Sequence, residues 1–211
     1  MTIKTFTFNP FQENTYLIYD ENKKAAIIDC GCILDYEKKA LAAYIAENEL
    51  QLIKVLNTHL HLDHQFGNRF LAESYGIRPE AHIDDEFLLE TVRAQGAMFG
   101  IPVKEEPQAL GAYIVDNQEI EVGSIKLKAF HVPGHSPGSV ALYSEAEGVV
   151  FVGDVLFRGS IGRTDLPKGD YATLIRSIQT KLLTLADSTV VYSGHGPSTT
   201  IGEEKTGNPF L

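Results

Sequence analysis

The chain has 211 residues, of which 44% are hydrophobic and 22% are charged, with 18 glycines and no tryptophan. This length suits one sizeable hydrophobic core, and we expect a single domain over residues 1–211. The net charge of −10 argues against a nucleic-acid-binding protein, because such proteins present a basic patch to the phosphate backbone.

Targeting signals and structural disulfides are not expected. The first twenty residues lack the charged start and the unbroken apolar stretch of a secretory signal. No apolar run is as long as a membrane span. Cys30 and Cys32 are too close together for an ordinary disulfide, and a lone C-x-C lacks the second ligand pair of a zinc ribbon. We therefore expect reduced thiols, a cytoplasmic protein and no membrane partner.

Two hydrophobic periods alternate along the chain, one typical of strands and one of amphipathic helices. The first half predicts strands over 5–8, 15–19 and 25–28, a helix over 35–50, a strand over 52–56 and helices over 65–75 and 84–98. The second half predicts a loop over 100–111, strands over 119–122, 125–131, 139–143 and 149–152, a helix over 171–185 and a strand over 189–192. Since each half runs from strands to helices, we expect two sheets packed face to face with helices outside.

Three of the seven histidines fall in Thr58-His59-Leu60-His61-Leu62-Asp63-His64, directly after a predicted buried strand. In extended chain, residues two apart point the same way, so His59 and His61 can converge on one ion. Where the chain turns into a helix, Asp63 and His64 can be aimed at a second point nearby. Imidazole and carboxylate are ligands that zinc, iron and manganese accept, so the segment predicts a metal site.

Three further candidates follow predicted strands, at the loops where functional sites are commonly assembled. His135 stands in the stiff turn Pro133-Gly134-His135-Ser136-Pro137-Gly138. Asp154 follows the apolar run 149–152, and His195 lies between two glycines that allow a close backbone approach. With the first cluster they supply five histidines and two aspartates.

In order and in local sequence, this set resembles the metallo-β-lactamase superfamily signature over nearly the whole chain. Asn14-Thr15-Tyr16, Ile27-Ile28-Asp29, 133–138 and 157–165 look like the glyoxalase II (hydroxyacylglutathione hydrolase) branch. The resemblance implies an α/β fold, the four-layer αβ/βα sandwich of the metallo-hydrolases, with a two-metal site at one edge of the sheets.

Ligand roles follow from the resemblance, position by position. It implies that His59, His61 and His135 bind a first metal ion, that Asp63, His64 and His195 bind a second, and that Asp154 bridges the two. The implied cofactors are two divalent metal ions. Zinc is the first expectation, with iron or manganese as alternatives, because this ligand set admits all three.

The resemblance implies a glyoxalase II-like thioesterase that cleaves S-acylglutathione or a related acyl thioester with a metal-bridging hydroxide. Asp63 is expected to be catalytic, orienting the nucleophile while it binds metal. Thiolate is a good leaving group, so the reaction requires no separate strong general acid. The expected partner is a small-molecule thioester, and the sequence leaves the oligomeric state open.

Four more residues are candidates around the metals. Arg163 occupies the position where enzymes of this branch place a cation for the peptide part of the substrate, and Lys205 is a second candidate for an anionic substrate tail. Asp29 ends an apolar strand pointing toward the site and is expected to support the ligands. His131 is a candidate for orienting a ligand by hydrogen bond, with a purely structural role as the alternative.

Other functions remain as alternatives. The stretch Gly162-Arg163-Thr164-Asp165 is similar to that of mononuclear-iron persulfide dioxygenases on the same fold. A metal-stabilised binding module is the non-enzymatic alternative. The resembled β-lactamases are usually exported and often use other second-metal ligands, which counts against β-lactam hydrolysis. Full-length glyoxalase II enzymes carry a further helical domain with much of the glutathione site. This chain stops about fifteen residues after His195. The resemblance therefore supports the hydrolytic chemistry better than it supports glutathione specificity.

Overall fold

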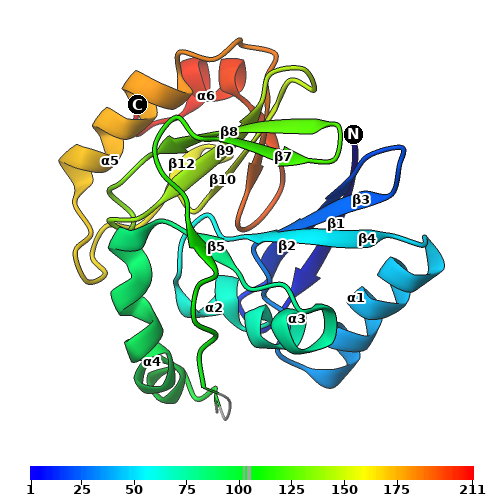
Figure 1. Cartoon of the computed structure of the whole chain (residues 1–211). Coiled ribbons are helices and arrows are strands. Elements are labelled where there is room, and N and C mark those ends of the chain that lie inside the picture. The colour runs from blue at the N-terminus through cyan, green and yellow to red at the C-terminus, as the bar shows by residue number, and fades with distance from the viewer. Residues whose placement is uncertain (102, 104–105) are drawn as a thin grey trace.

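Residues 1–101, 103 and 106–211 are described by a computed structural model (Figure 1). Their strands form two six-stranded sheets, with orders β1-β2-β3-β4-β5-β6 and β14-β13-β10-β9-β8-β7, and a two-stranded ribbon, β11-β12. The strands are β1 Thr2–Phe8, β2 Glu13–Tyr19, β3 Lys24–Ile28, β4 Gln51–Leu56, β5 Glu80–Ala81, β6 Ala112–Tyr113, β7 Glu119–Val122, β8 Ile125–His131, β9 Val140–Ser144, β10 Val149–Gly153, β11 Leu156–Phe157, β12 Ser160–Ile161, β13 Val190–Ser193 and β14 Thr199–Thr200.

Helices cover the outer face of each sheet. In Figure 1, α1 and α3 lie beside the first sheet, and α5 and α6 lie beside the second. The helices are α1 Asp35–Glu47, α2 Leu62–Gln65, α3 Asn68–Tyr75, the 3₁₀ helix η1 Ile83–Thr91, α4 Val92–Met98, α5 Tyr171–Ser177, the π-helical turn η2 Ile178–Leu182 and α6 Ile201–Gly207. None of the helices among the described residues is long and apolar enough to span a membrane.

The alternation of strand side chains divides the apolar residues among separate cores. On β2, Ile18 packs between the two sheets with Phe151 of β10, whereas its neighbour Leu17 packs outward with Leu41 of α1. On β10, Val150 packs outward with Leu174 of α5. The layers therefore run helix, sheet, sheet, helix, and the predicted four-layer αβ/βα sandwich is confirmed.

Several predicted helices are subdivided. The helix predicted over 84–98 is a 3₁₀ helix followed by α4, and the buried residues of η1, Asp85 and Leu88, are three apart, as the three-residue turn requires. The helix over 65–75 is α2 and α3, and the helix over 171–185 is α5 continued by η2. Within the predicted loop 100–111, residues 102, 104 and 105 lie outside the described residues.

The two sheets meet at the edge where the candidate ligands lie. Backbone hydrogen bonds join them there: Val140 donates to the Thr58 carbonyl at 2.8 Å, and Asn14 donates to the Gly194 carbonyl at 2.7 Å. In the second sheet, β10 and β13 are parallel, with Gly153 opposite Ser193. The residues that follow these two strands therefore emerge side by side.

Candidate metal centre

Four of the seven candidate ligands follow β4. His61 has an extended backbone, with φ of −62° and ψ of 153°, and directly precedes α2, which carries Asp63 and His64. The Asn57 side chain donates to the His64 carbonyl at 2.8 Å and holds this turn closed. All four side chains, His59 included, are buried. Burying so many polar groups is costly unless partners satisfy them.

The other three candidates come from loops of the second sheet: His135 after β8, Asp154 after β10 and His195 after β13. Glycine is required where these loops meet. A Cβ on Gly194 would collide with Oδ1 of Asp154. A Cβ on Gly153, whose φ is +53°, would collide with the Thr58 hydroxyl. The glycines therefore let the two strand ends approach the first sheet.

Three imidazoles form the first group. Nδ1 of His61 lies 2.8 Å from Nε2 of His135, and that Nε2 lies 3.3 Å from Nε2 of His59. Two ligand atoms about 2.1 Å from a tetrahedral ion lie roughly 3.4 Å apart, so this spacing is close to that of a zinc site. The three histidines can therefore hold one metal ion.

Asp63, His64 and His195 form the second group. Oδ2 of Asp63 lies 3.2 Å from Nε2 of His195 and 3.7 Å from Nε2 of His64. Asp154 lies between the groups: its Oδ1 is 3.5 Å from Nε2 of His64, and its Oδ2 is 3.4 Å from Nε2 of His195 and 3.8 Å from Nε2 of His135. One carboxylate thus reaches both groups.

In four of the candidate histidines, Nε2 faces the ligand groups and Nδ1 lies within hydrogen-bond distance of another part of the chain. Nδ1 of His59 lies 3.1 Å from the Thr58 hydroxyl, and Nδ1 of His64 lies 3.0 Å from Oδ2 of Asp29. Nδ1 of His135 donates to the Arg163 carbonyl, and Nδ1 of His195 donates to the Phe11 carbonyl. These are the hydrogen bonds that fix ring orientation and tautomer in metal sites. The partners in this set are Thr58, Asp29, Arg163 and Phe11.

The two groups have opposite electrostatics. Burial lowers the pKa of His61 to about 3, and repulsion from His135 adds to this effect. Burial also disfavours the charged form of His195, but hydrogen bonds to Asp154 and Asp63 outweigh it and raise the pKa to about 10. Burial likewise disfavours ionised Asp154, yet His64 and His195 hold the pKa of this carboxyl well below its usual range. The second group therefore attracts positive charge.

Divalent metal ions fit this arrangement. Nε2 of His64 and Oδ1 of Asp154 are buried and have no hydrogen-bond partner among the described residues. Buried polar atoms in folded proteins are rarely left without a hydrogen-bond partner, an ordered water or a bound ion. Neutral imidazole and carboxylate donors are the ligands that zinc, iron and manganese accept.

Asp29 lies where the sequence places a supporting residue. Its Oδ1 accepts from the Thr58 backbone at 2.7 Å, and its Oδ2 accepts from the Thr58 hydroxyl and faces His64. Its φ of 53° is a left-handed conformation that Asp adopts more readily than most residues. Asp29 thereby links β3 to the ligand-bearing segment.

Asp85 is a supporting residue that sequence reasoning missed. Its buried carboxylate accepts hydrogen bonds from the Leu60 backbone at 3.1 Å, the Ser136 hydroxyl at 2.7 Å and the Gly138 backbone at 2.6 Å. Leu60 lies between two candidate ligands, and Ser136 follows a third. In the sequence, Asp85 differs from its acidic neighbours only in lying three residues before Leu88. Acidic residues are common at the start of helices, so this spacing did not mark Asp85 as a supporting residue.

The remaining candidates lie elsewhere. The guanidinium of Arg163 is exposed and pairs with Asp165, while its carbonyl is what contacts His135. Lys205 pairs with Asp187 at 2.5 Å. His131 donates from Nε2 to the Pro137 carbonyl and stacks on His82 with ring centroids 4.0 Å apart, so it contacts the loop of His135 rather than the ring.

The chain is similar in sequence and in structure to proteins of one superfamily. Residues 8–195 match the sequence model of the metallo-beta-lactamase superfamily. The chain is 43% identical over 220 residues to "Hydroxyacylglutathione hydrolase GloC" of Haemophilus influenzae, covering 100% of this chain and 98% of that protein. The structure of "BLEG-1 B3 metallo-beta-lactamase" is 36% identical, with a TM-score of 0.89 and coverage of 100% and 99%. That of "TTHA1623 in a di-iron-bound form" is 36% identical, with a TM-score of 0.87 and coverage of 99% and 100%.

Proposed function

Because the chain belongs to the metallo-beta-lactamase superfamily, we propose that it is a dinuclear-metal-dependent hydrolase of acyl thioesters, of the glyoxalase II type. The position of Asp154 carries this proposal, since its two oxygens face both candidate ligand groups. The similarity to a hydroxyacylglutathione hydrolase over the full length of both chains supports S-acylglutathione as the first substrate to test. We propose the same ligand roles that the family resemblance implies: three histidines for the first ion, Asp63, His64 and His195 for the second, and Asp154 between them.

Two zinc ions are the proposed cofactors. Iron is the main alternative, because one similar structure, TTHA1623, is described in a di-iron-bound form. The nitrogen and oxygen donors accept both metals, so metal availability decides between them. When bound, the two ions would polarise the thioester carbonyl and lower the pKa of bound water, so that hydroxide is available as the nucleophile near neutral pH.

The side chains orient this chemistry. The exposed fraction of the ligand side chains rises from 0% at His64 to 26% at His195, so substrate enters from the His195 side. Oδ2 of Asp63 faces His195 and His64, and we assign the other oxygen, Oδ1, to accepting a hydrogen bond from the attacking water. Arg163 is the proposed contact for an anionic end of the substrate and would have to release Asp165, just as Lys205 would have to release Asp187.

Thioester assays test the proposal. Purified protein is assayed with S-lactoylglutathione and a panel of acyl thioesters before and after chelation and metal restoration. The expected result is thioester cleavage that disappears with chelator, returns with metal and is lost in Asp154→Ala. If no thioester is cleaved by the metal-loaded protein, the proposal is wrong.

Two parallel assays separate the alternatives. A β-lactam substrate is included because the similar BLEG-1 structure is described as a B3 metallo-beta-lactamase. Oxygen consumption with glutathione persulfide tests the dioxygenase, which uses one iron ion. Metal analysis with two ions per chain, lowered by His195→Ala, favours the hydrolase, whereas one iron per chain with oxygen consumption favours the dioxygenase.

A further inference from the structure

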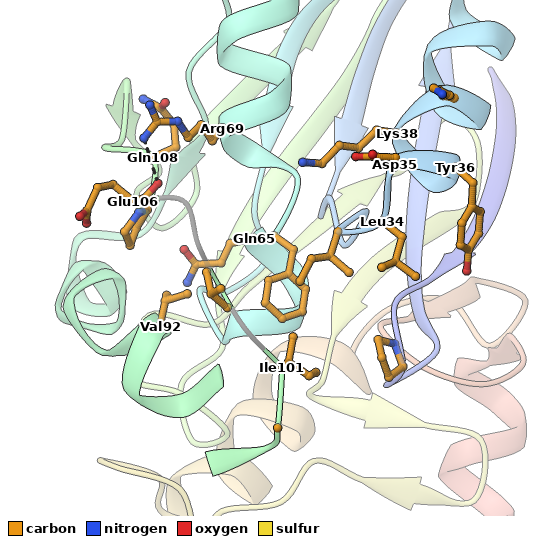
Figure 2. A pocket seen from close by; sticks show the side chains of 17 residues that line it. Leu34, Asp35, Tyr36, Lys38, Gln65, Arg69, Val92, Ile101, Glu106 and Gln108 are labelled. Atoms are coloured by element: carbon orange, nitrogen blue, oxygen red, sulfur yellow. Dashed lines mark hydrogen bonds between the residues drawn. The ribbon is translucent and has the colours of Figure 1, made fainter. Parts of the chain in front are cut away.

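A cavity lies apart from the candidate metal ligands. It has a volume of about 820 Å³ and lies between the start of α1 and the segment after α4, with α2 and α3 between them (Figure 2). Figure 2 shows Leu34 and Tyr36 toward one end of the cavity, Arg69, Glu106 and Gln108 at the other, and Gln65 between them. None of the seven candidate metal ligands lines it. Its volume is within the range of about 300–1,000 Å³ that small-molecule sites occupy.

The lining combines an apolar floor with charged walls. The apolar side chains include Ile33, Leu34, Phe66, Val92, Ile101 and Val103. Three cationic side chains, Lys38, Lys39 and Arg69, line the cavity together with two acidic ones, Asp35 and Glu106. Arg69 pairs with Glu73 at 2.7 Å and donates to the Glu106 carbonyl, so Lys38 and Lys39 at the start of α1 supply the cationic part of the lining that faces Ile33 and Leu34 along the chain.

The chemistry of the lining specifies the ligand. Apolar surface in a concave site favours an apolar chain or ring, because covering that surface removes it from water. Lysine and arginine beside that surface favour an acidic group on the same ligand and disfavour a cationic one. Burial of both parts requires a molecule that joins an apolar body to an anionic head.

We propose that this cavity is a binding site for a small amphipathic anion, an apolar chain or ring that carries a carboxylate or a similar acidic group. None of the candidate metal ligands lines this site, and the proposal does not depend on the proposed hydrolysis. The apolar body lies over Phe66, Ile33 and Ile101, and the acidic head lies toward Lys38 and Lys39.

The cavity is joined to the metal centre through α2. Asp63 and His64 belong to the second ligand group, while the next two residues, Gln65 and Phe66, line the cavity. The Gln65 amide also donates to the carbonyl of Leu60 at 2.5 Å, and Leu60 stands between two candidate ligands in the sequence. A ligand in the cavity therefore contacts residues that hold the ligand-bearing segment in place.

Calorimetric titration of the metal-loaded protein with decanoate tests the proposal, with decanol as the uncharged probe. We expect one decanoate per chain, and decanol at least tenfold weaker. The double variant Lys38→Glu/Lys39→Glu should weaken decanoate at least tenfold, and Leu34→Glu, at the exposed rim, should weaken it as well. Lys126→Glu, at an exposed position of β8 in the second sheet, is the control and should bind decanoate as the parent does.

A carboxylate can also bind metal, and His61→Ala separates the two sites. Decanoate binding retained in His61→Ala and lost in Lys38→Glu/Lys39→Glu supports the cavity. Binding lost in His61→Ala but retained in the lysine variant overturns the proposal, as does an absence of decanoate binding to the parent protein. Equal affinity for decanoate and decanol overturns the anionic class. Circular dichroism and thermal unfolding verify that each variant is folded.

Discussion

The carboxylate of Asp85 accepts a hydrogen bond from the hydroxyl of Ser136 at 2.7 Å, one residue after the candidate ligand His135. The same carboxylate accepts from the backbone of Leu60, between two ligands of the other sheet. One buried side chain therefore sets the spacing between the two loops that form the three-histidine group.

Asp85→Ala is expected to weaken metal binding at the three-histidine group and to lower thioesterase activity. Removal of the carboxylate leaves buried donors of Leu60, Ser136 and Gly138 without their acceptor, which costs about 1–3 kcal/mol for an unsatisfied group. Chelator competition measures metal affinity, and thermal unfolding with and without metal measures stability. Asp84→Asn, at the exposed neighbouring position, is the control. Equal metal affinity in Asp85→Ala and the parent would show that the loops hold their spacing without it.

Asp29→Asn is expected to lower metal affinity at the second group. Asparagine tolerates the left-handed backbone at this position, so the variant isolates the loss of charge and of one acceptor oxygen facing His64. Loss of a hydrogen bond that orients a metal-binding histidine typically lowers metal affinity 10- to 100-fold. Stoichiometric zinc titration against a chromophoric chelator gives the affinity of each group, and an unchanged second affinity would contradict the role assigned to Asp29.

Gly194→Ala is expected to reduce metal content and activity, because the added Cβ would collide with Oδ1 of Asp154. Gly207→Ala is the matched control, since a Cβ there meets nothing within 4 Å. Elemental analysis of both variants after identical purification is the measurement. Full metal content in Gly194→Ala would mean that Asp154 is not held where the structure places it.

Zinc binding to the metal-free protein is expected to release protons at pH 7. Burial lowers the pKa of His195, but its hydrogen bonds to Asp154 and Asp63 outweigh this and raise it to about 10, so the ring is protonated at pH 7 and must lose its proton to bind metal. Calorimetry in buffers of different ionisation enthalpy counts the protons. His195→Ala should release fewer protons per zinc ion, and identical release from both proteins would contradict this role of His195.

The same pKa predicts how the metal-free protein responds to pH. A group whose pKa rises on folding stabilises the folded state fully below its unfolded value, here 6.5, and this stabilisation is lost as the pH rises through the folded value of about 10. The stability difference between parent and His195→Ala, measured by urea unfolding in chelator, should therefore be larger at pH 6 than at pH 10.

The sequence predicted most of the architecture and located the candidate ligands, because both depend on local patterns. His59 and His61 follow a buried strand, and Asp154 follows an apolar run, so their positions could be inferred without knowing the partners. The role of Asp85 could not be inferred, because it depends on contacts with residues 60, 136 and 138 that only the folded chain brings together.

Short elements were also missed. Helix α6 buries only Ile201 and Glu204 and contains two glycines, so it has little apolar periodicity to detect. Strands β5 and β6 are two residues each. They are recognised by the pairing of β5 with β4 and with β6, and their composition alone does not predict them. The position of the Arg163 guanidinium likewise depends on its bidentate pairing with Asp165, which the local motif did not indicate.

The edge where β4, β10 and β13 end has a consequence for how the protein folds. Its ligands span residues 59 to 195, and the chain between them must be ordered before they meet. Closure of such long loops is entropically unfavourable until many native contacts exist, so the metal pocket closes late in folding. Metal that binds only after closure slows unfolding and leaves the folding rate nearly unchanged. The metal centre thus determines how long the folded chain persists rather than how quickly it forms.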